Sequence, residues 1–244
     1  MPRFFIDKDR IQDGTLYIDG ADAHHIARSL RMAVGDTLTV TDKEGFEYLC
    51  RLSRIRDERC ELDILSQKRS DSESPCRITL FMAYPKGDKL ETVIQKAVEL
   101  GASEIVPFES SRCIKKPKAD KIAERTSRLS KIAEEAAKQC GRAILPRVSL
   151  PIRFQDMLAR AQDFDIPIFC YEGEGTLSLK SILDSRPIPQ SIAVVVGSEG
   201  GFSEEEAAAA LASGFIGANL GPRILRCETA PDYALSCISY KYEL

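Results

Sequence analysis

Apolar runs and amphipathic helical patterns alternate along the chain from Cys76 onward, and this order is what most restricts the fold. Ile78 to Tyr84 is predicted to be a strand, and the helix after it has apolar residues at helical spacing from Leu90 to Val98. Further strands are expected near 105–108, 144–148, 166–171 and 192–196, with helices between them, including a long one over 122–140 and a last one over 230–242. This alternation predicts an α/β fold, a mainly parallel sheet with helices on both faces. Sheets of this kind bind ligands at the carboxyl ends of their strands.

Residues 1–70 show a β pattern instead. Residues 37–41 alternate with period two, turn residues follow at 42–45, and the alternation continues over 48–52 and 60–65, while a short helix is expected over 23–31. A polar stretch that ends in Pro75 suits a linker. The sequence therefore predicts a small β domain over 1–70 and an α/β domain over 76–244.

A glycine-rich turn follows the apolar strand at 192–196. It reads Gly197-Ser198-Glu199-Gly200-Gly201-Phe202, and Ser203 with Glu206 then has the form of a capping box, which predicts the start of a helix. Such turns often hold phosphates, because free N–H groups and the helix dipole attract anions. Here four glutamates lie between 199 and 206, and the spacing fits neither the dinucleotide fingerprint nor the P-loop. The turn therefore favours a neutral or cationic ligand such as S-adenosylmethionine (SAM).

A second loop, residues 219–230, contains Gly221-Pro222-Arg223 and then Ile224-Leu225-Arg226. Glycine can take backbone angles closed to other residues, and proline stiffens the segment after it. The two apolar residues could wall an adenine while the arginines face an anionic partner. Taken alone, the loop is better explained as an ordinary strand-to-helix connection that carries surface arginines.

Residues 197–203 and 220–230 resemble the two C-terminal signatures of the RsmE family, bacterial 16S ribosomal RNA methyltransferases of the SPOUT, or trefoil-knot, class that methylate N3 of one uridine. Two further stretches match that family, residues 85–101 and, near the start, His24-His25-Ile26 with Leu30-Arg31 and Gly35-Asp36. Four separated motifs in the family's order are more specific than any one of them. The resemblance implies a SPOUT methyltransferase domain over 76–244 and a PUA-like β-barrel domain over 1–70 that helps to grip RNA.

The resemblance also implies SAM as the cofactor, a homodimer and a knot in which the loop from Gly221 to Thr229 threads through the chain. The implied cofactor-binding residues are Gly197, Glu199, Gly200, Gly201, Phe202, Leu220, Gly221, Ile224, Leu225, Arg226, Glu228, Thr229 and Ala230. The final helix is the candidate for part of the dimer interface. Ser198 stands where the family usually has proline, which predicts a less rigid first loop.

Methylation of uracil N3 requires loss of its proton, so the site must stabilise an anion whose charge spreads over O2 and O4. An arginine suits this task because it stays protonated and can donate two hydrogen bonds. Arg226 is the first candidate for this catalytic role and Arg223 the second. Glu199 and Glu228 could hold the amino group of SAM or accept the proton, although a glutamate of ordinary pKa is a poor base at pH 7. A structural role, in which they cap backbone N–H groups of the loops, is the favoured interpretation.

Basic residues are concentrated in one part of the chain. The net charge is −3, yet residues 112–147 contain eleven Lys or Arg against four acids, which leaves −10 for the rest. RNA responds to the nearby field because charges are screened beyond about 10 Å. A solvated helix face is the alternative explanation for this segment, and salt bridges to nearby acids are an equally simple explanation for Arg3, Arg28 and Arg31 in the β domain. The residues expected to meet 16S rRNA, free or within the 30S subunit, are Arg3, Arg28, Arg31, Arg112, Lys115, Lys116, Lys121, Gln139 and Arg142.

The remaining composition predicts neither a metal site nor disulfides. The eight cysteines include no C-x-x-C pair, and the only histidines are His24 and His25. No apolar run reaches the roughly 18 residues of a membrane span, so a cytoplasmic protein is expected. Two other functions stay open, another SPOUT enzyme that methylates tRNA or a ribose 2′-hydroxyl, and a non-catalytic RNA-binding factor in ribosome assembly.

Overall fold

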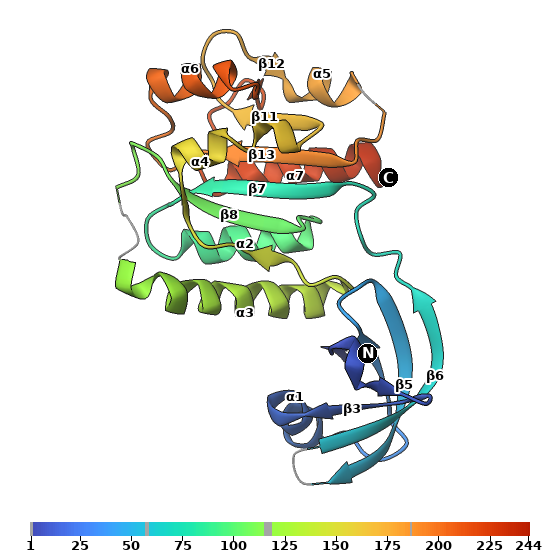
Figure 1. The fold of residues 1–244 in the computed structure, drawn as a ribbon. Helices are drawn as coiled ribbons and strands as arrows, with labels where there is room; N and C mark the ends of the chain where they lie inside the picture. The colour runs from blue at the N-terminus through green and yellow to red at the C-terminus, as the bar shows by residue number, and fades with distance from the viewer. Residues whose placement is uncertain (1, 57–58, 115–118, 186) are drawn as a thin grey trace. The chain divides into compact units, whose positions relative to one another are not determined.

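The computed structural model describes residues 2–56, 59–114, 119–185 and 187–244. The chain forms two compact units. One contains residues 1–73 together with 137–145, and the other contains 74–136 and 146–244. Figure 1 shows the first unit as mostly strands and the second as alternating strands and helices.

The first unit is built on a sheet with the strand order β1-β4-β5-β6-β3-β2. β1 pairs with β4 in parallel, and the other neighbours are antiparallel. The long strands β5 and β6 pair along most of their length, with two register shifts. The strands are β1 (Arg3–Phe5), β2 (Ile11–Gln12), β3 (Thr15–Asp19), β4 (Thr37–Thr41), β5 (Phe46–Arg56) and β6 (Arg59–Arg69).

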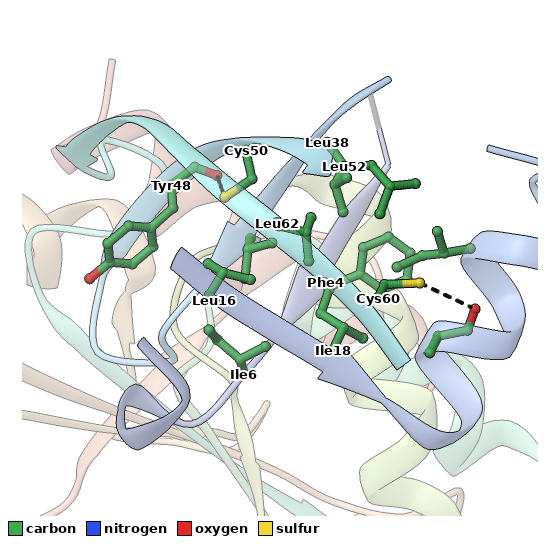
Figure 2. Close-up of a cluster of buried hydrophobic side chains, with 13 residues drawn as sticks. Phe4, Ile6, Leu16, Ile18, Leu38, Tyr48, Cys50, Leu52, Cys60 and Leu62 are labelled. Atoms are coloured by element: carbon green, nitrogen blue, oxygen red, sulfur yellow. Dashed lines mark hydrogen bonds between the residues drawn. The ribbon is translucent and has the colours of Figure 1, made fainter. Parts of the chain in front are cut away.

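Alternating side chains of these strands form the core of the first unit. In β3, Leu16 and Ile18 are buried while Tyr17 between them is partly exposed, as a period of two requires. Figure 2 shows the cluster, to which the neighbouring strands β4, β5 and β6 contribute Leu38, Leu52 and Leu62. Cys50 and Cys60 are part of it, and burial raises the pKa of the Cys50 thiol to about 12. Cys50 and Cys60 therefore act as small apolar core residues, as the sequence suggests.

The helix predicted over 23–31 begins earlier and changes type. α1 (Gly20–His24) leads directly into a π-helical turn, His25–Ser29. Ile26 in this turn is fully buried against the sheet core. A helix was therefore predicted in the right region, but its start and the wider winding of its second half were not.

Residues 137–145 belong to the first unit, because Glu73 holds them there. Its carboxylate accepts hydrogen bonds from Arg142 Nε and Nη2 at 3.0 and 2.6 Å and from the N–H groups of Ala143 and Ile144. These N–H groups are therefore not available for the strand predicted over 144–148, and Pro146 has none. Only Arg147–Val148 is extended, as β9, so the predicted extent was wrong.

The second unit contains a sheet with the order β10-β8-β7-β13-β11-β14-β12, in which β9 pairs with β8. Every pairing described in it is parallel, which confirms the sequence prediction. The two-residue strands β10 and β12 were not predicted. β14 was not predicted either, since Gly217 interrupts its apolar run. The strands are β7 (Arg77–Ala83), β8 (Glu104–Glu109), β9 (Arg147–Val148), β10 (Ile152–Arg153), β11 (Ile166–Cys170), β12 (Leu177–Ser178), β13 (Ser191–Val196) and β14 (Ile216–Asn219).

The helices predicted by apolar spacing are present. α7 packs against β13, α2 and α5, and it contributes Ala234, Leu235 and Ile238 to the core. α2 buries Leu90, Val93, Ile94, Ala97 and Val98. The helices from α2 onward are α2 (Lys89–Glu99), α3 (Ile122–Cys140), α4 (Phe154–Leu158), α5 (Leu179–Asp184), α6 (Glu204–Ala212) and α7 (Thr229–Tyr242). None of the helices over the described residues combines the length and apolar character needed to cross a membrane.

An aromatic cluster supports the ends of the central strands. Phe169 of β11 is fully buried, and its ring centroid lies 4.3 Å from that of Phe202, which follows the glycine turn. Phe108 of β8 is parallel to the Phe202 ring at 6.3 Å, and Phe154 contacts both. The turn after β13 is thus anchored to the core through one phenylalanine.

Candidate functional site

A cavity of about 580 Å³ lies within the second unit, at the carboxyl ends of β11, β13 and β14. Parallel strands bring these ends to one edge of the sheet. The cavity is lined by Lys89, Arg112, Cys170, Tyr171, Glu172, Val196, Gly197, Ser198, Glu199, Gly200, Gly201, Phe202, Ala218, Leu220, Ile224, Leu225, Arg226, Cys227, Glu228 and Ala230. Residues of the glycine-rich turn and of the loop over 219–230 therefore line the same cavity.

The glycine turn after β13 forms one wall. The N–H of Gly201 donates to the carbonyl of Ser198 at 2.9 Å, and Gly201 has φ of 63°, a conformation that favours glycine. A side chain on Gly200 would approach Arg112 Cβ to 3.0 Å. Ser198 is buried, and its hydroxyl donates to the Arg112 carbonyl at 3.3 Å. The serine thus ties the turn to the segment after β8.

The capping box after the turn is present and has a further contact. Ser203 Oγ accepts from the Glu206 N–H, and Glu206 Oε2 accepts from the Ser203 N–H. The other carboxylate oxygen of Glu206 accepts from the Ser111 N–H at 2.6 Å. This contact holds the neighbouring Arg112, whose Nη1 donates to the Gly200 carbonyl at 3.1 Å. Arg112 therefore forms part of the cavity wall.

The second loop closes the opposite side. Gly221 has φ of 101°, and the carbonyl of Arg226 accepts from the N–H groups of Thr229 and Ala230, where α7 begins. The Arg226 backbone is thereby fixed at the helix start. Arg226 lines the cavity, and its exposed side chain makes no hydrogen bond or ion pair with any residue in the described part of the chain. Ile224 is 84% exposed, so the tip of this loop offers an apolar surface to a ligand or partner.

Three charged groups meet at the cavity edge. Lys89 Nζ lies 3.1 Å from a carboxylate oxygen of Glu199 and 3.1 Å from one of Glu228, so it bridges the two loops. The Lys86 N–H also donates to the Glu199 carboxylate. Hydrogen bonding to Glu228 and then to Glu199 raises the pKa of Lys89 above its ordinary value. The lysine is therefore a fixed cation at neutral pH.

Both glutamates remain ionised. Burial raises the pKa of Glu199, but hydrogen bonds from backbone N–H groups and the Lys89 ammonium outweigh it and hold that pKa below its usual value. A hydrogen bond from the Cys227 thiol, at 3.2 Å, is the main cause that lowers the pKa of Glu228. Burial, with the neighbouring carboxylates, raises the pKa of Cys227 to about 12, so the thiol keeps its proton. Glu199 and Glu228 are consequently weak bases.

A third segment of the cavity, Cys170 to Glu172 at the end of β11, was not predicted as part of the site. A side chain on Gly173 would come within 2.1 Å of the Tyr171 ring, so the bare glycine lets this ring lie across the backbone. The sequence does contain a signal for this turn, Glu172-Gly173-Glu174-Gly175, two glycines directly after an apolar strand. Lys89, Val196, Ser198, Ala218 and Cys227 also line the cavity without having been predicted as cofactor-binding residues.

Most residues proposed for the cofactor lie together. Gly221 and Thr229 do not line the cavity, and the other residues of that set do: Gly197, Glu199, Gly200, Gly201, Phe202, Leu220, Ile224, Leu225, Arg226, Glu228 and Ala230. Gly221 shapes the loop, and the Thr229 N–H helps to start α7. Of the two catalytic candidates, Arg226 faces the cavity, whereas Arg223 is exposed outside it.

The residues proposed for RNA lie in different environments. Arg142 is only 4% exposed and is held by Glu73, so this placement leaves its guanidinium unavailable to RNA. Arg3 pairs with the largely buried Glu47 at 2.8 Å, as the salt-bridge alternative anticipates. Arg112 belongs to the cavity wall. Arg28, Arg31, Lys121 and Gln139 are exposed, and Lys115 and Lys116 lie outside the described residues.

In the parts of the chain that the structure describes, no group of three or more His, Cys, Asp or Glu side chains is arranged to hold a metal ion. The cysteines described are all free thiols, most of them buried. The site is thus made of glycine-rich backbone, apolar walls, paired carboxylates and two arginines.

The chain matches family models and sequences of RNA methyltransferases. An RNA methyltransferase domain model matches residues 72–239, and an RNA methyltransferase PUA domain model matches residues 18–65. The chain is 39% identical to the ribosomal RNA small subunit methyltransferase E of Bacillus subtilis, covering 100% of this chain and 98% of that protein. It is 31% identical to the protein of that name from Synechocystis sp., covering 97% and 77%.

The fold of the chain is also similar to that of a solved methyltransferase structure. The crystal structure of a ribosomal RNA small subunit methyltransferase E from Neisseria gonorrhoeae, bound to S-adenosyl methionine, has a TM-score of 0.86 to this chain at 30% identity, covering 99% of this chain and 98% of that one. The expected fold class, an α/β methyltransferase domain preceded by a PUA-like domain, is confirmed. By the extent of these matches and the placing of its motifs around one cavity, the chain belongs to the ribosomal RNA small subunit methyltransferase E family.

Proposed function

We propose that this protein transfers a methyl group from SAM to N3 of a uridine in 16S rRNA, within the 30S subunit. The observation that carries this proposal is the joining of the two signature loops around one cavity, with Arg226 facing into it. The relatives named above carry the ribosomal RNA methyltransferase name, and the Neisseria gonorrhoeae protein binds SAM.

The cavity residues fit SAM chemically. Leu220, Leu225 and Ala218 supply an apolar surface suited to adenine, and the glycines of the first loop let backbone N–H and carbonyl groups approach its edge. The ionised carboxylates of Glu199 and Glu228 suit the positive charge of the sulfonium and amino groups. When bound, SAM supplies an activated methyl group. The threading of residues 221–229 through a knot stays a prediction.

The chemistry assigned to the protein is stabilisation of the uracil anion. The Arg226 guanidinium can donate two hydrogen bonds to uracil oxygen, where negative charge collects once N3 loses its proton. Its fixed backbone at the start of α7 limits the reorganisation needed. The lowered pKa values of Glu199 and Glu228 make them poor proton acceptors, so their assigned role is to bind and orient the cofactor.

The same proposal includes a homodimer that acts in the cytoplasm, where ribosomal subunits are. α7 leaves Tyr233 42% and Tyr240 76% exposed, and the terminal Leu244 is 97% exposed. A second copy that covers these side chains would remove apolar surface from water. These exposed side chains support the candidate dimer interface at the C-terminal helix.

The test of the function is loss and recovery of one modification. Mass spectrometry of 16S rRNA from cells that lack this gene should show one unmethylated uridine, and the purified protein with SAM should methylate N3 of that uridine in isolated 30S subunits. Methylation of tRNA or of a ribose hydroxyl instead would assign another activity. Absence of SAM binding in calorimetry would point to a non-catalytic RNA-binding factor.

Charge reversal of the basic segment should weaken RNA binding. Lys121→Glu combined with Lys115→Glu and Lys116→Glu removes cations that displace counterions from RNA, so affinity should fall and depend less steeply on salt, by roughly 0.7 to 0.9 in logarithmic slope per lost contact. Filter binding of a 16S rRNA fragment at several salt concentrations measures both. Lys180→Glu, which changes an 89% exposed lysine on α5, is the control and should bind normally. Unchanged affinity in the triple variant would place the RNA surface elsewhere.

A further inference from the structure

Lys89 is the one residue outside the two signature loops, among those that the structure describes, that joins them directly through charge. It is the first residue of α2, which follows β7, whereas Glu199 follows β13 and Glu228 precedes α7. Both ion pairs measure 3.1 Å. The Lys86 N–H adds a contact from the same turn to Glu199. Three segments that are distant in sequence therefore converge on one ammonium group.

We propose that Lys89 is a positioning residue for the cofactor, which holds the carboxylates of Glu199 and Glu228 at the cavity edge and joins the two loops that carry them. The inference rests on the proposed function, because the cofactor concerned is SAM. It adds a residue and a role to that site, and it explains why two carboxylates can lie close together there without repelling the loops apart.

The charge at this edge supports the role. Two carboxylates and one ammonium leave a net charge of −1, which favours a ligand with a positive sulfonium centre. The Cys227 thiol donates to Glu228 and adds no charge. Other charged groups that line the cavity are Glu172, Arg112 and Arg226. Without Lys89, both glutamates would lose their shared cation, while burial and their mutual repulsion would remain.

Lys89 itself is not suited to act as the base. A base must be neutral before it accepts a proton, and both carboxylates stabilise the charged form of this lysine. Its side chain is 35% exposed, and each glutamate side chain is 26% exposed. Ion pairs of this exposure are individually weak. The proposed role is therefore one of geometry and charge state, and the effect of its loss should be moderate.

The test compares the SAM affinity of the wild type and of three variants of this chain by calorimetry, at a series of pH values from 8 down to 5. Lys89→Met keeps the length of the side chain without its charge, and it should weaken SAM binding about tenfold at pH 8. Lys89→Arg restores a cation and should recover most of the affinity. Lys96→Met is the matched control, a lysine of the same helix that pairs with Glu99 and does not line the cavity, and it should bind as the wild type does.

The pH comparison separates positioning of charge from simple support of the fold. In the wild type the pKa values of both glutamates are lowered, so they stay ionised at pH 6 and pH 8 and affinity should be nearly constant. Without the lysine these pKa values rise, so the loss of affinity on acidification should begin at a higher pH in Lys89→Met than in the wild type. The same onset of this loss in both proteins, or wild-type affinity in Lys89→Met, would overturn the role of Lys89 alone. A wild-type protein that does not bind SAM would overturn the proposed function together with it.

Discussion

Arg226→Ala is expected to abolish methyl transfer while leaving SAM binding largely intact. Arg226 lines the cavity, and its side chain makes no hydrogen bond or ion pair with the described residues, so its removal breaks no polar contact among them. Loss of one donor to a developing anion typically lowers kcat by about 100-fold to 1000-fold. Single-turnover methylation of isolated 30S subunits measures the chemical step, and calorimetry with SAM measures binding.

Two further variants sharpen this prediction. Arg226→Lys keeps the positive charge but not the planar pair of donors, so it should recover only a small part of the activity. Arg223→Ala changes an arginine of the same loop that is exposed outside the cavity, and its effect on the single-turnover rate should be much smaller. Normal turnover in Arg226→Ala would refute the catalytic role of this residue.

Phe169→Ala should strongly destabilise the protein. Phe169 is fully buried in β11 and contacts Phe202, Phe215 and Tyr171 through its ring. Truncation of a buried phenylalanine removes apolar contacts and leaves a cavity, which costs about 3–5 kcal/mol in the free energy of unfolding. Urea unfolding followed by circular dichroism should show a clear fall in the transition midpoint.

Phe169→Ala should also weaken SAM binding. Phe202 follows the glycine turn and lines the cavity, so the loss of its partner at 4.3 Å loosens that wall, and SAM affinity should fall at temperatures where the variant is still folded. Leu150→Ala is the control, because this side chain is 57% exposed and its truncation should change stability by less than about 0.5 kcal/mol. Equal midpoints for the two variants would contradict the structural role assigned to Phe169.

The elements with strong local patterns were predictable. Each of these patterns involves residues that are close together in the sequence. They are the apolar spacing of α2 and α7, the capping box at Ser203 and the apolar runs of β7 and β13. Short strands were missed, because β10 and β12 have two residues each and take their extended form from a neighbouring strand. The strand expected over 144–148 was too long, because Glu73 binds the backbone there.

The candidate site was predicted to the extent that its residues lie in two continuous loops. The glycine turn and the arginine loop carry unusual local composition, so both could be recognised in the amino-acid sequence. Cys170 to Glu172 and Lys89 line the same cavity but lie in segments whose local composition is less distinctive. Only the parallel order of β7, β13, β11 and β14 brings their ends together.

The sequence by itself determined the fold class, the capped start of α6 and the two loops of the site, because hydrophobic periodicity, capping and glycine conformation act between residues that are near in the chain. The tertiary structure alone decided which charges are free and which are committed. Arg142 meets Glu73 from 69 residues away and is buried, while Arg226 remains open to the cavity, although both are arginines in glycine-containing loops. Pairing across such separations depends on where the packed strands place each side chain, and no local pattern encodes it.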